Sequence, residues 1–233
     1  MGGRYALIIG NFNFEKYESL PFIEEYALKL KELFGDPRIG GYKVDLYNNT
    51  TEIELRKIIS NFYSARESDD ITLFYFLGHG DLYSGDFYFI TKDSDPNDLY
   101  TYGIDTNYFK KILNTCESTR NMMIADCSYS GSFAMSMGGV GTYILASSSK
   151  YEAAWNANFS KKLIQGLVNG NADFYPNDGK IMISEMFQYV RKELKGQNQK
   201  PVTTFSGGGD YILAFNPKWE SKPNDYEAFK GEG

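Results

Sequence analysis

Short apolar runs alternate along this chain with longer segments whose apolar residues recur every three or four positions. A short continuous apolar run that ends at a turn residue is typical of a buried β-strand. The strands predicted in this way cover residues 4–10, 42–47, 71–77, 87–90, 121–126, 142–147 and 210–215. The pattern therefore predicts strands and helices in alternation.

The helical spacing is clearest from Ile23 to Phe34, where Gly35 and the proline that follows soon after end the pattern. Thr51 and Glu54 form a capping-box pattern that opens a second helix. Further helices are predicted near 105–115, 157–169 and 184–195, with a polar loop at 91–104.

Alternating strands and helices, with strands apolar on both faces, indicate an α/β fold in which helices cover both faces of a largely parallel sheet. No internal repeat or linker interrupts residues 1–215, which are predicted to form one domain. Residues 216–233 are polar and contain proline and glycine, so they are predicted to be a tail or a stub that leads to further domains.

Composition narrows the function classes. The net charge of −6 does not favour a general nucleic-acid binder, which needs a basic face to meet phosphates. No apolar run approaches the roughly 18 residues that a membrane span requires. Two cysteines, Cys116 and Cys127, do not make a disulfide framework, so a reducing cytoplasm is expected. We therefore expect neither nucleic acid nor membrane as a partner.

His79 is the single histidine of the chain. A zinc site takes about four ligands rich in cysteine and histidine, and too few are present, so no zinc site is expected and no metal ligand is assigned. A mechanism that needs an imidazole must use His79. A packed histidine in a turn is the alternative reading of this residue.

Two central strands lead directly into reactive side chains. The strand at 71–77 runs into Gly-His-Gly at 78–80, and the strand at 121–126 runs into Cys127 and Ser128. Sites in open α/β sheets lie beyond the carboxyl ends of the strands. An α/β-hydrolase elbow is excluded, because no G-x-S-x-G surrounds Ser128 or Ser130, and because the histidine precedes both serines. A nucleophile beside an imidazole predicts nucleophilic catalysis.

These motifs resemble the caspase and metacaspase superfamily, in particular bacterial caspase-family proteins. The resemblance is carried by "YALIIGNFNF", "DDITLFYFLGHG", "MMIADCSYSGSF", "DGKIMISEMFQYV" and "GDYILAFNP". His79 and Ser128 are 49 residues apart, in agreement with the caspase spacing of about 50. The resemblance implies a three-layer sandwich around a mostly parallel sheet of about six strands.

The resemblance also implies a cysteine endopeptidase with a histidine–cysteine dyad and no cofactor. His79 would be the acid–base residue, and the backbone N–H of Gly80 would help to form the oxyanion hole. Asp126 would bind a basic residue, so that cleavage follows arginine or lysine; the alternative is that Asp126 caps the helix beginning near Ser130. Ser147 and Glu152, in the segment 147–155, are further candidates for the substrate pocket.

The register of the motif moves the nucleophile away from the cysteine. In D-x-C-[aromatic or His]-S-G the catalytic cysteine is the third residue, and that position holds Ser128. Strand alternation agrees independently, because Asp126 and Ser128 share a face while Cys127 points to the other. Cys127 is therefore predicted to pack in the core as a small apolar residue.

A hydroxyl needs stronger activation than a thiol, so we expect little or no peptidase activity from this chain. Three explanations stay open: a Cys→Ser change made to trap an inactive enzyme, a natural pseudopeptidase that acts as a peptide-binding or regulatory module, and Cys127 as a displaced nucleophile. The first helix has Tyr26 where family members usually have a pocket aspartate. Specificity for a basic residue then depends mostly on Asp126.

Other implications of the resemblance concern regulation. Metacaspases are often activated by calcium, and the loop after Gly80 contains Asp81, Asp86, Asp93, Asp95 and Asp98, although solvated acids are the alternative. The join from Gly131 to Thr142 is short, so the chain is expected to work without internal processing. The implied partners are a peptide or protein substrate and fused or associated sensor or effector domains, in bacterial defence.

Overall fold

A computed structural model of the chain describes residues 2–138, 141–152, 156–207 and 209–219. The main sheet has six strands in the order β10-β8-β7-β3-β1-β2. Their bounds are β1 Arg4–Gly10, β2 Lys43–Asn48, β3 Ile71–Leu77, β7 Arg120–Asp126, β8 Thr142–Ala146 and β10 Val202–Phe205. All pairs are parallel except β10 with β8. The predicted α/β class and mostly parallel six-stranded sheet are confirmed.

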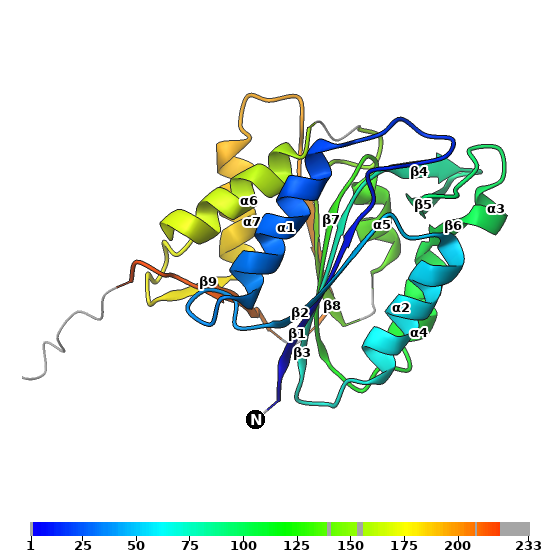
Figure 1. The fold of residues 1–233 in the computed structure, drawn as a ribbon. Coiled ribbons are helices and arrows are strands. Elements are labelled where there is room, and N and C mark those ends of the chain that lie inside the picture. The colour runs from blue at the N-terminus through cyan, green and yellow to red at the C-terminus, as the bar shows by residue number, and fades with distance from the viewer. Residues whose placement is uncertain (1, 139–140, 153–155, 208, 220–233) are drawn as a thin grey trace, which may run out of the picture.

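Helices cover both faces of this sheet (Figure 1). One face carries α1 (Phe22–Gly35), α6 (Asn158–Asn169) and α7 (Ile183–Glu193), and the other carries α2 (Glu52–Ser64), α4 (Thr106–Leu113) and α5 (Ser130–Ser136). Alternation along β1 separates the two cores: Ala6 and Ile8 pack in the first, Leu7 and Ile9 in the second. The predicted capping box at the start of α2 is present, with Glu54 N–H donating to the Thr51 hydroxyl.

A second, three-stranded sheet follows the Gly-His-Gly turn. It contains β4 (Gly80–Tyr83), β5 (Asp86–Ile90) and β6 (Gly103–Asp105), with α3 (Leu99–Tyr102) before β6. The loop predicted at 91–104 thus has α3 and the first two residues of β6 at its end. These elements were not predicted, because a helix of four residues and a strand of three are too short to show a periodic spacing of apolar residues.

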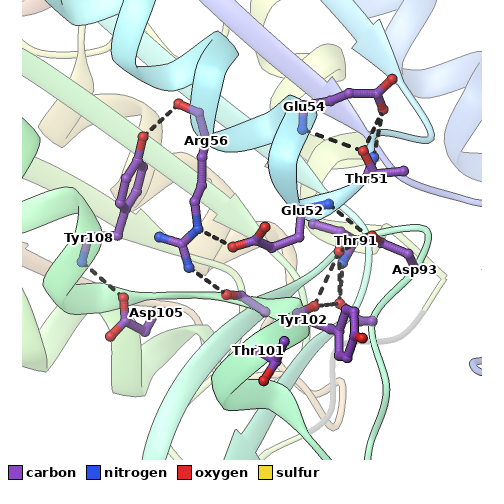
Figure 2. A network of polar contacts seen from close by, with 12 residues as sticks. Thr51, Glu52, Glu54, Arg56, Thr91, Asp93, Thr101, Tyr102, Asp105 and Tyr108 are labelled. Atoms are coloured by element: carbon purple, nitrogen blue, oxygen red, sulfur yellow. Dashed lines mark hydrogen bonds and ion pairs between the residues drawn. The ribbon is translucent and has the colours of Figure 1, made fainter.

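A polar network fixes this small sheet against α2 (Figure 2). The Arg56 guanidinium pairs with Glu52 and donates to the carbonyl of Gly103 over 3.0 Å, while the Tyr108 hydroxyl donates to the carbonyl of Arg56 over 2.6 Å. These bonds join α2, α4 and β6, so β4, which begins at Gly80, belongs to a braced unit.

The sequence pattern predicts the C-terminal strand but not the sheet to which it belongs. β11 (Ile212–Phe215) pairs with β9 (Lys180–Met182) outside the main sheet, whose edge is instead the unpredicted β10. The Arg4 side chain of β1 donates to the carbonyls of Gly40, Ile212 and Leu213 over 2.9–3.1 Å, which ties the start of the domain to its end.

The first residues of the predicted tail pack on the domain. Asn216 donates to Asp173 over 3.0 Å, and the Trp219 ring lies against Gly179, whose Cβ would be 2.7 Å from it. Residues 220–233 lie outside the described residues.

Candidate active site

The two predicted catalytic positions follow neighbouring strands at the same level. β3 and β7 are parallel, and Leu77 is the register partner of Asp126. His79 and Ser128 each lie two residues beyond this pair, and Gly78 N–H still bonds the Asp126 carbonyl at 3.4 Å. Parallel pairing thus carries both residues to the carboxyl edge of the sheet.

Gly80 brings the histidine turn into contact with the nucleophile strand. A Cβ on Gly80 would lie 2.4 Å from the Ser128 carbonyl oxygen, 2.7 Å from the Phe87 ring and 2.9 Å from Cys127 Sγ. All three neighbours are backbone or core atoms, which have little room to move. Glycine is required here because of the close approach.

A backbone carbonyl orients His79. The Nε2 atom of His79 lies 2.8 Å from the carbonyl oxygen of Glu18. Since a carbonyl oxygen only accepts, Nε2 carries the proton, and the neutral ring keeps Nδ1 as its basic nitrogen. The Phe14 ring centroid is 4.9 Å from that of His79 and the Tyr17 centroid 5.7 Å, so the imidazole is also packed on one side.

The loop that supplies these groups runs from Asn11 to Pro21 between β1 and α1 and reaches toward β4 (Figure 1, dark blue). Asn11 is fully buried; its side chain donates to the Ile90 carbonyl over 3.1 Å and accepts from Thr50 N–H over 2.9 Å. Tyr17 donates to Asp81 over 3.0 Å. The loop is therefore tied to both sheets. Sequence reasoning found no group that orients His79, because a main-chain carbonyl has no residue signature.

Cys127 is a core residue, as predicted. It is 2% exposed and packs in the apolar core beneath α5, and burial raises the pKa of its thiol well above the ordinary value. Ser128, one residue on, is partly exposed. Tyr129 adopts φ +58°, which turns the chain from the strand into α5, and its N–H donates to the Glu152 carbonyl over 2.9 Å.

Asp126 is buried and directed at α6. Its Oδ2 accepts from Ser160 N–H over 3.0 Å and from the Ser160 hydroxyl over 2.6 Å, in the first turn of that helix. Its side chain therefore binds the N-terminus of α6, and this corrects the alternative that it caps the helix near Ser130. The Ser160 hydroxyl is also 2.8 Å from the hydroxyl of Tyr75.

The second oxygen of Asp126 has a different status. Oδ1 is buried and has no hydrogen-bond partner among the described residues. Burial raises the pKa of this carboxyl, although the Ser160 donors and the nearby Ser147 hydroxyl oppose the rise; the Ser147 hydroxyl itself donates to the Cys127 carbonyl. One oxygen is thus held by protein donors while the other keeps its capacity to accept.

Ser147 and Glu152 hold the backbone around these residues. Ser147 is fully buried, and its hydroxyl donates to the Cys127 carbonyl over 3.3 Å. The Glu152 carboxylate accepts from Lys200 N–H over 3.1 Å. Residues 153–155, the end of the predicted pocket segment, lie outside the described residues.

Four of the five acids suggested for calcium bond to other groups of the protein, and Asp81 does so by accepting from Tyr17. Asp93 accepts from Glu52 N–H and the Thr91 hydroxyl, both over 2.8 Å, Asp95 pairs with Lys16, and Asp98 caps α3. Among the described residues, no three His, Cys, Asp or Glu side chains gather at a site that could hold a metal.

Comparisons with known proteins identify a family and a similar fold. The family model of the caspase domain matches residues 3–208. Among solved structures, protein GSU0716 from Geobacter sulfurreducens is similar over 89% of this chain and 95% of its own, with a TM-score of 0.62 and 14% identity, a likeness of fold alone. No curated protein matches significantly. Across the described part of the chain, no helix is long and apolar enough to cross a bilayer.

Proposed function

The chain belongs to the caspase domain family, a family of cysteine peptidases, and from this membership we propose that it is an endopeptidase domain whose dyad is His79 and residue 128. The observation that carries the proposal is the contact of the Gly-His-Gly turn with the end of β7, where Gly80 touches the Ser128 carbonyl. This contact supports a site that combines an imidazole, a nucleophile position and a backbone donor at one sheet edge.

The reaction follows from these groups. With cysteine at position 128, His79 Nδ1 takes the thiol proton, and the thiolate attacks the carbonyl carbon of the scissile peptide bond. The N–H groups of Gly80 and residue 128 stabilise the oxyanion of the tetrahedral intermediate. His79 then gives the proton to the leaving amine, and water hydrolyses the acyl-enzyme. No cofactor takes part in these steps.

We propose cleavage after arginine or lysine. Asp126 has an acceptor, Oδ1, that no described residue uses. A guanidinium or ammonium group would offset the burial that raises the pKa of this carboxyl, and it would bind the ionised form through a charge-assisted hydrogen bond. Tyr26 packs against the core and supplies no second carboxylate.

The serine at position 128 limits this activity. The His79 ring is oriented by the carbonyl of Glu18, which has no formal charge to stabilise an imidazolium ion. A thiol near neutral pH needs little help to ionise, whereas a hydroxyl needs a strongly supported base. We therefore propose that the chain with Ser128 cleaves slowly or not at all. Ser128 also favours the second candidate, a pseudopeptidase that binds peptides.

One experiment separates these functions. The chain and its Ser128→Cys variant are incubated with fluorogenic peptides that end in arginine, lysine or aspartate, with calcium or with EDTA. The peptidase proposal expects Ser128→Cys to cleave after arginine or lysine, and expects His79→Ala in that variant to abolish cleavage. If the folded Ser128→Cys variant cleaves none of these peptides, only the peptide-binding function would remain. Activity of the unaltered chain that is lost in Cys127→Ala would overturn the register.

A further inference from the structure

A groove of about 950 Å³ lies between α7 and the edge strand β10, apart from the catalytic positions. Phe187 and Leu194 from the α7 side, with Val202 from β10, form its apolar part. Both Phe187 and Leu194 are buried, so the groove has a packed floor.

The rim of the groove is basic. Arg191, Lys192, Lys195 and Lys200 line it, and its lining contains no carboxylate. All four cations are exposed, and none is in an ion pair within the part of the chain that the structure describes. The whole chain carries a net charge of −6, so this face opposes the overall charge.

Helix polarity explains only part of this cluster. Arg191 and Lys192 lie in the last turn of α7, where cations stabilise the helix dipole. Lys195 and Lys200 lie beyond the last residue of the helix, and the connection to β10 brings Lys200 to the same groove. The cluster thus combines charges from two segments.

The strand beside the groove is open to pairing. β10 is the last strand of the described main sheet, so its outer edge has no strand partner there. Exposed strand edges recruit extended peptides by main-chain hydrogen bonds, and adjacent side chains give specificity. We propose that this groove docks an extended acidic segment of a partner protein, which adds to β10 while its carboxylates meet the four cations.

Charge favours an acidic partner over a second copy of the chain. A two-fold symmetric dimer through β10 would place the same patch of both copies face to face, and the cations of one copy would meet those of the other. An acidic segment instead neutralises them. The proposal does not depend on catalysis, because no residue of the groove belongs to the dyad.

The groove is joined to the active-site loops. The buried Gln199 side chain donates to the Ser147 carbonyl over 2.9 Å, and Lys200 N–H donates to the Glu152 carboxylate. A segment that orders residues 199–203 would therefore act directly on the backbone that supports Cys127 and Tyr129. The docking site is placed to present a partner near the catalytic edge.

Binding can be measured with a fluorescein-labelled acidic peptide, GEVETEVEG, by anisotropy. We expect saturable binding that weakens with added salt, and at least tenfold weaker binding to an Arg191→Ala/Lys195→Ala variant. The matched control is Lys110→Ala/Lys111→Ala, which removes the same charge from the last turn of α4 and should bind as the unaltered chain does. A backbone N-methylated peptide should bind more weakly, because it cannot pair with β10.

Three results would overturn the proposal: equal binding of the uncharged peptide GQVQTQVQG, unchanged affinity of the folded groove variant, or a concentration-dependent dimer in sedimentation that Arg191→Ala/Lys195→Ala abolishes. Circular dichroism confirms that both double variants are folded. His79→Ala should bind the peptide with unchanged affinity, so a failure of the peptidase proposal leaves this test intact.

Discussion

The backbone of Gly80 lies so close to Ser128 that a Cβ on Gly80 would stand 2.4 Å from the Ser128 carbonyl oxygen. This relationship makes the geometry of the proposed oxyanion hole depend on the absence of a side chain at Gly80. It also accounts for the second glycine of the Gly-His-Gly turn, since β4 starts at that residue and could not start so near β7 with any other.

The first prediction concerns this contact. In the Ser128→Cys background, Gly80→Ala should lower kcat/KM about a hundredfold, because the added methyl displaces the turn and its N–H donor by a fraction of an ångström or more. The same change should lower the free energy of unfolding by about 1–3 kcal/mol through overpacking. Gly209→Ala is the control, since nothing lies within 4 Å of its Cβ position. Full activity of Gly80→Ala would contradict the proposed oxyanion hole.

The second prediction concerns the thiols. Burial raises the thiol pKa of both cysteines, but Cys127 is buried whereas Cys116 is partly exposed. An aromatic disulfide reagent should modify Cys116 in the folded chain. It should modify Cys127 at least a hundredfold more slowly, because that thiol reacts only when the chain unfolds. The Ser128→Cys variant should gain a fast third thiol whose rate falls in His79→Ala. Equal rates at Cys116 and Cys127 would restore Cys127 as a candidate nucleophile.

The third prediction concerns Asp126 and pH. Burial raises its pKa in the folded chain above the unfolded value of about 3.9, so its contribution to stability is full below that pH and is lost as pH rises through the folded pKa. Asp126→Asn removes this loss and should be more stable than the unaltered chain at pH 7. The difference should shrink near pH 4, as measured by urea unfolding. Greater stability of the unaltered chain than of Asp126→Asn at pH 7 would contradict this prediction.

The same substitution should reduce function. In the Ser128→Cys background, Asp126→Asn should lower kcat/KM for arginine and lysine peptides at least tenfold, the scale of one hydrogen bond to a charged group. Ser160→Ala serves as a contrast, because it removes a donor to Asp126 Oδ2 and should lower stability while Oδ1 stays available. Unchanged cleavage after arginine by the Asp126→Asn enzyme would assign the pocket to other residues.

The fourth prediction concerns the orientation of His79. In the Ser128→Cys background, Phe14→Ala removes a ring 4.9 Å from the imidazole and should lower kcat about tenfold with KM little changed. Glu18→Ala should have no effect on kcat, because only the backbone carbonyl of that residue is used. Tyr47→Ala is the aromatic control, because Tyr47 lies on β2, an edge strand of the main sheet that is not adjacent to β3 or β7. A rise in KM alone would assign Phe14 to substrate binding.

The main strands could be predicted because each is a continuous apolar run buried on both faces. Residues 71–77 were predicted without error, and 121–126 begins one residue late. The burial of Cys127 followed from strand alternation alone. β10 could not be predicted, since Val202–Phe205 is half exposed at the sheet edge and has two threonines in four residues.

The candidate site could be predicted only where side chains carry the chemistry. His79, Asp126 and position 128 are side-chain positions at strand ends. The carbonyl of Glu18 is a main-chain group, and the bond from Asp126 to Ser160 joins residues 34 apart in the sequence. Both depend on how loops and helices pack over the sheet, which periodicity does not encode.

The hydrogen bonds from the Arg4 side chain to the carbonyls of Gly40, Ile212 and Leu213 have a consequence for synthesis on the ribosome. Chains emerge N-terminus first, and most of the sheet can pair as its strands leave the exit tunnel. Two of the carbonyl acceptors of Arg4, those of Ile212 and Leu213, are made more than two hundred residues after Arg4 itself. Of the partners that Arg4 has in the folded domain, only the Gly40 carbonyl and the Tyr42 ring are made early, so the strands that precede the candidate site can pair before these last bonds form, and the last bonds require that β11 has been synthesised.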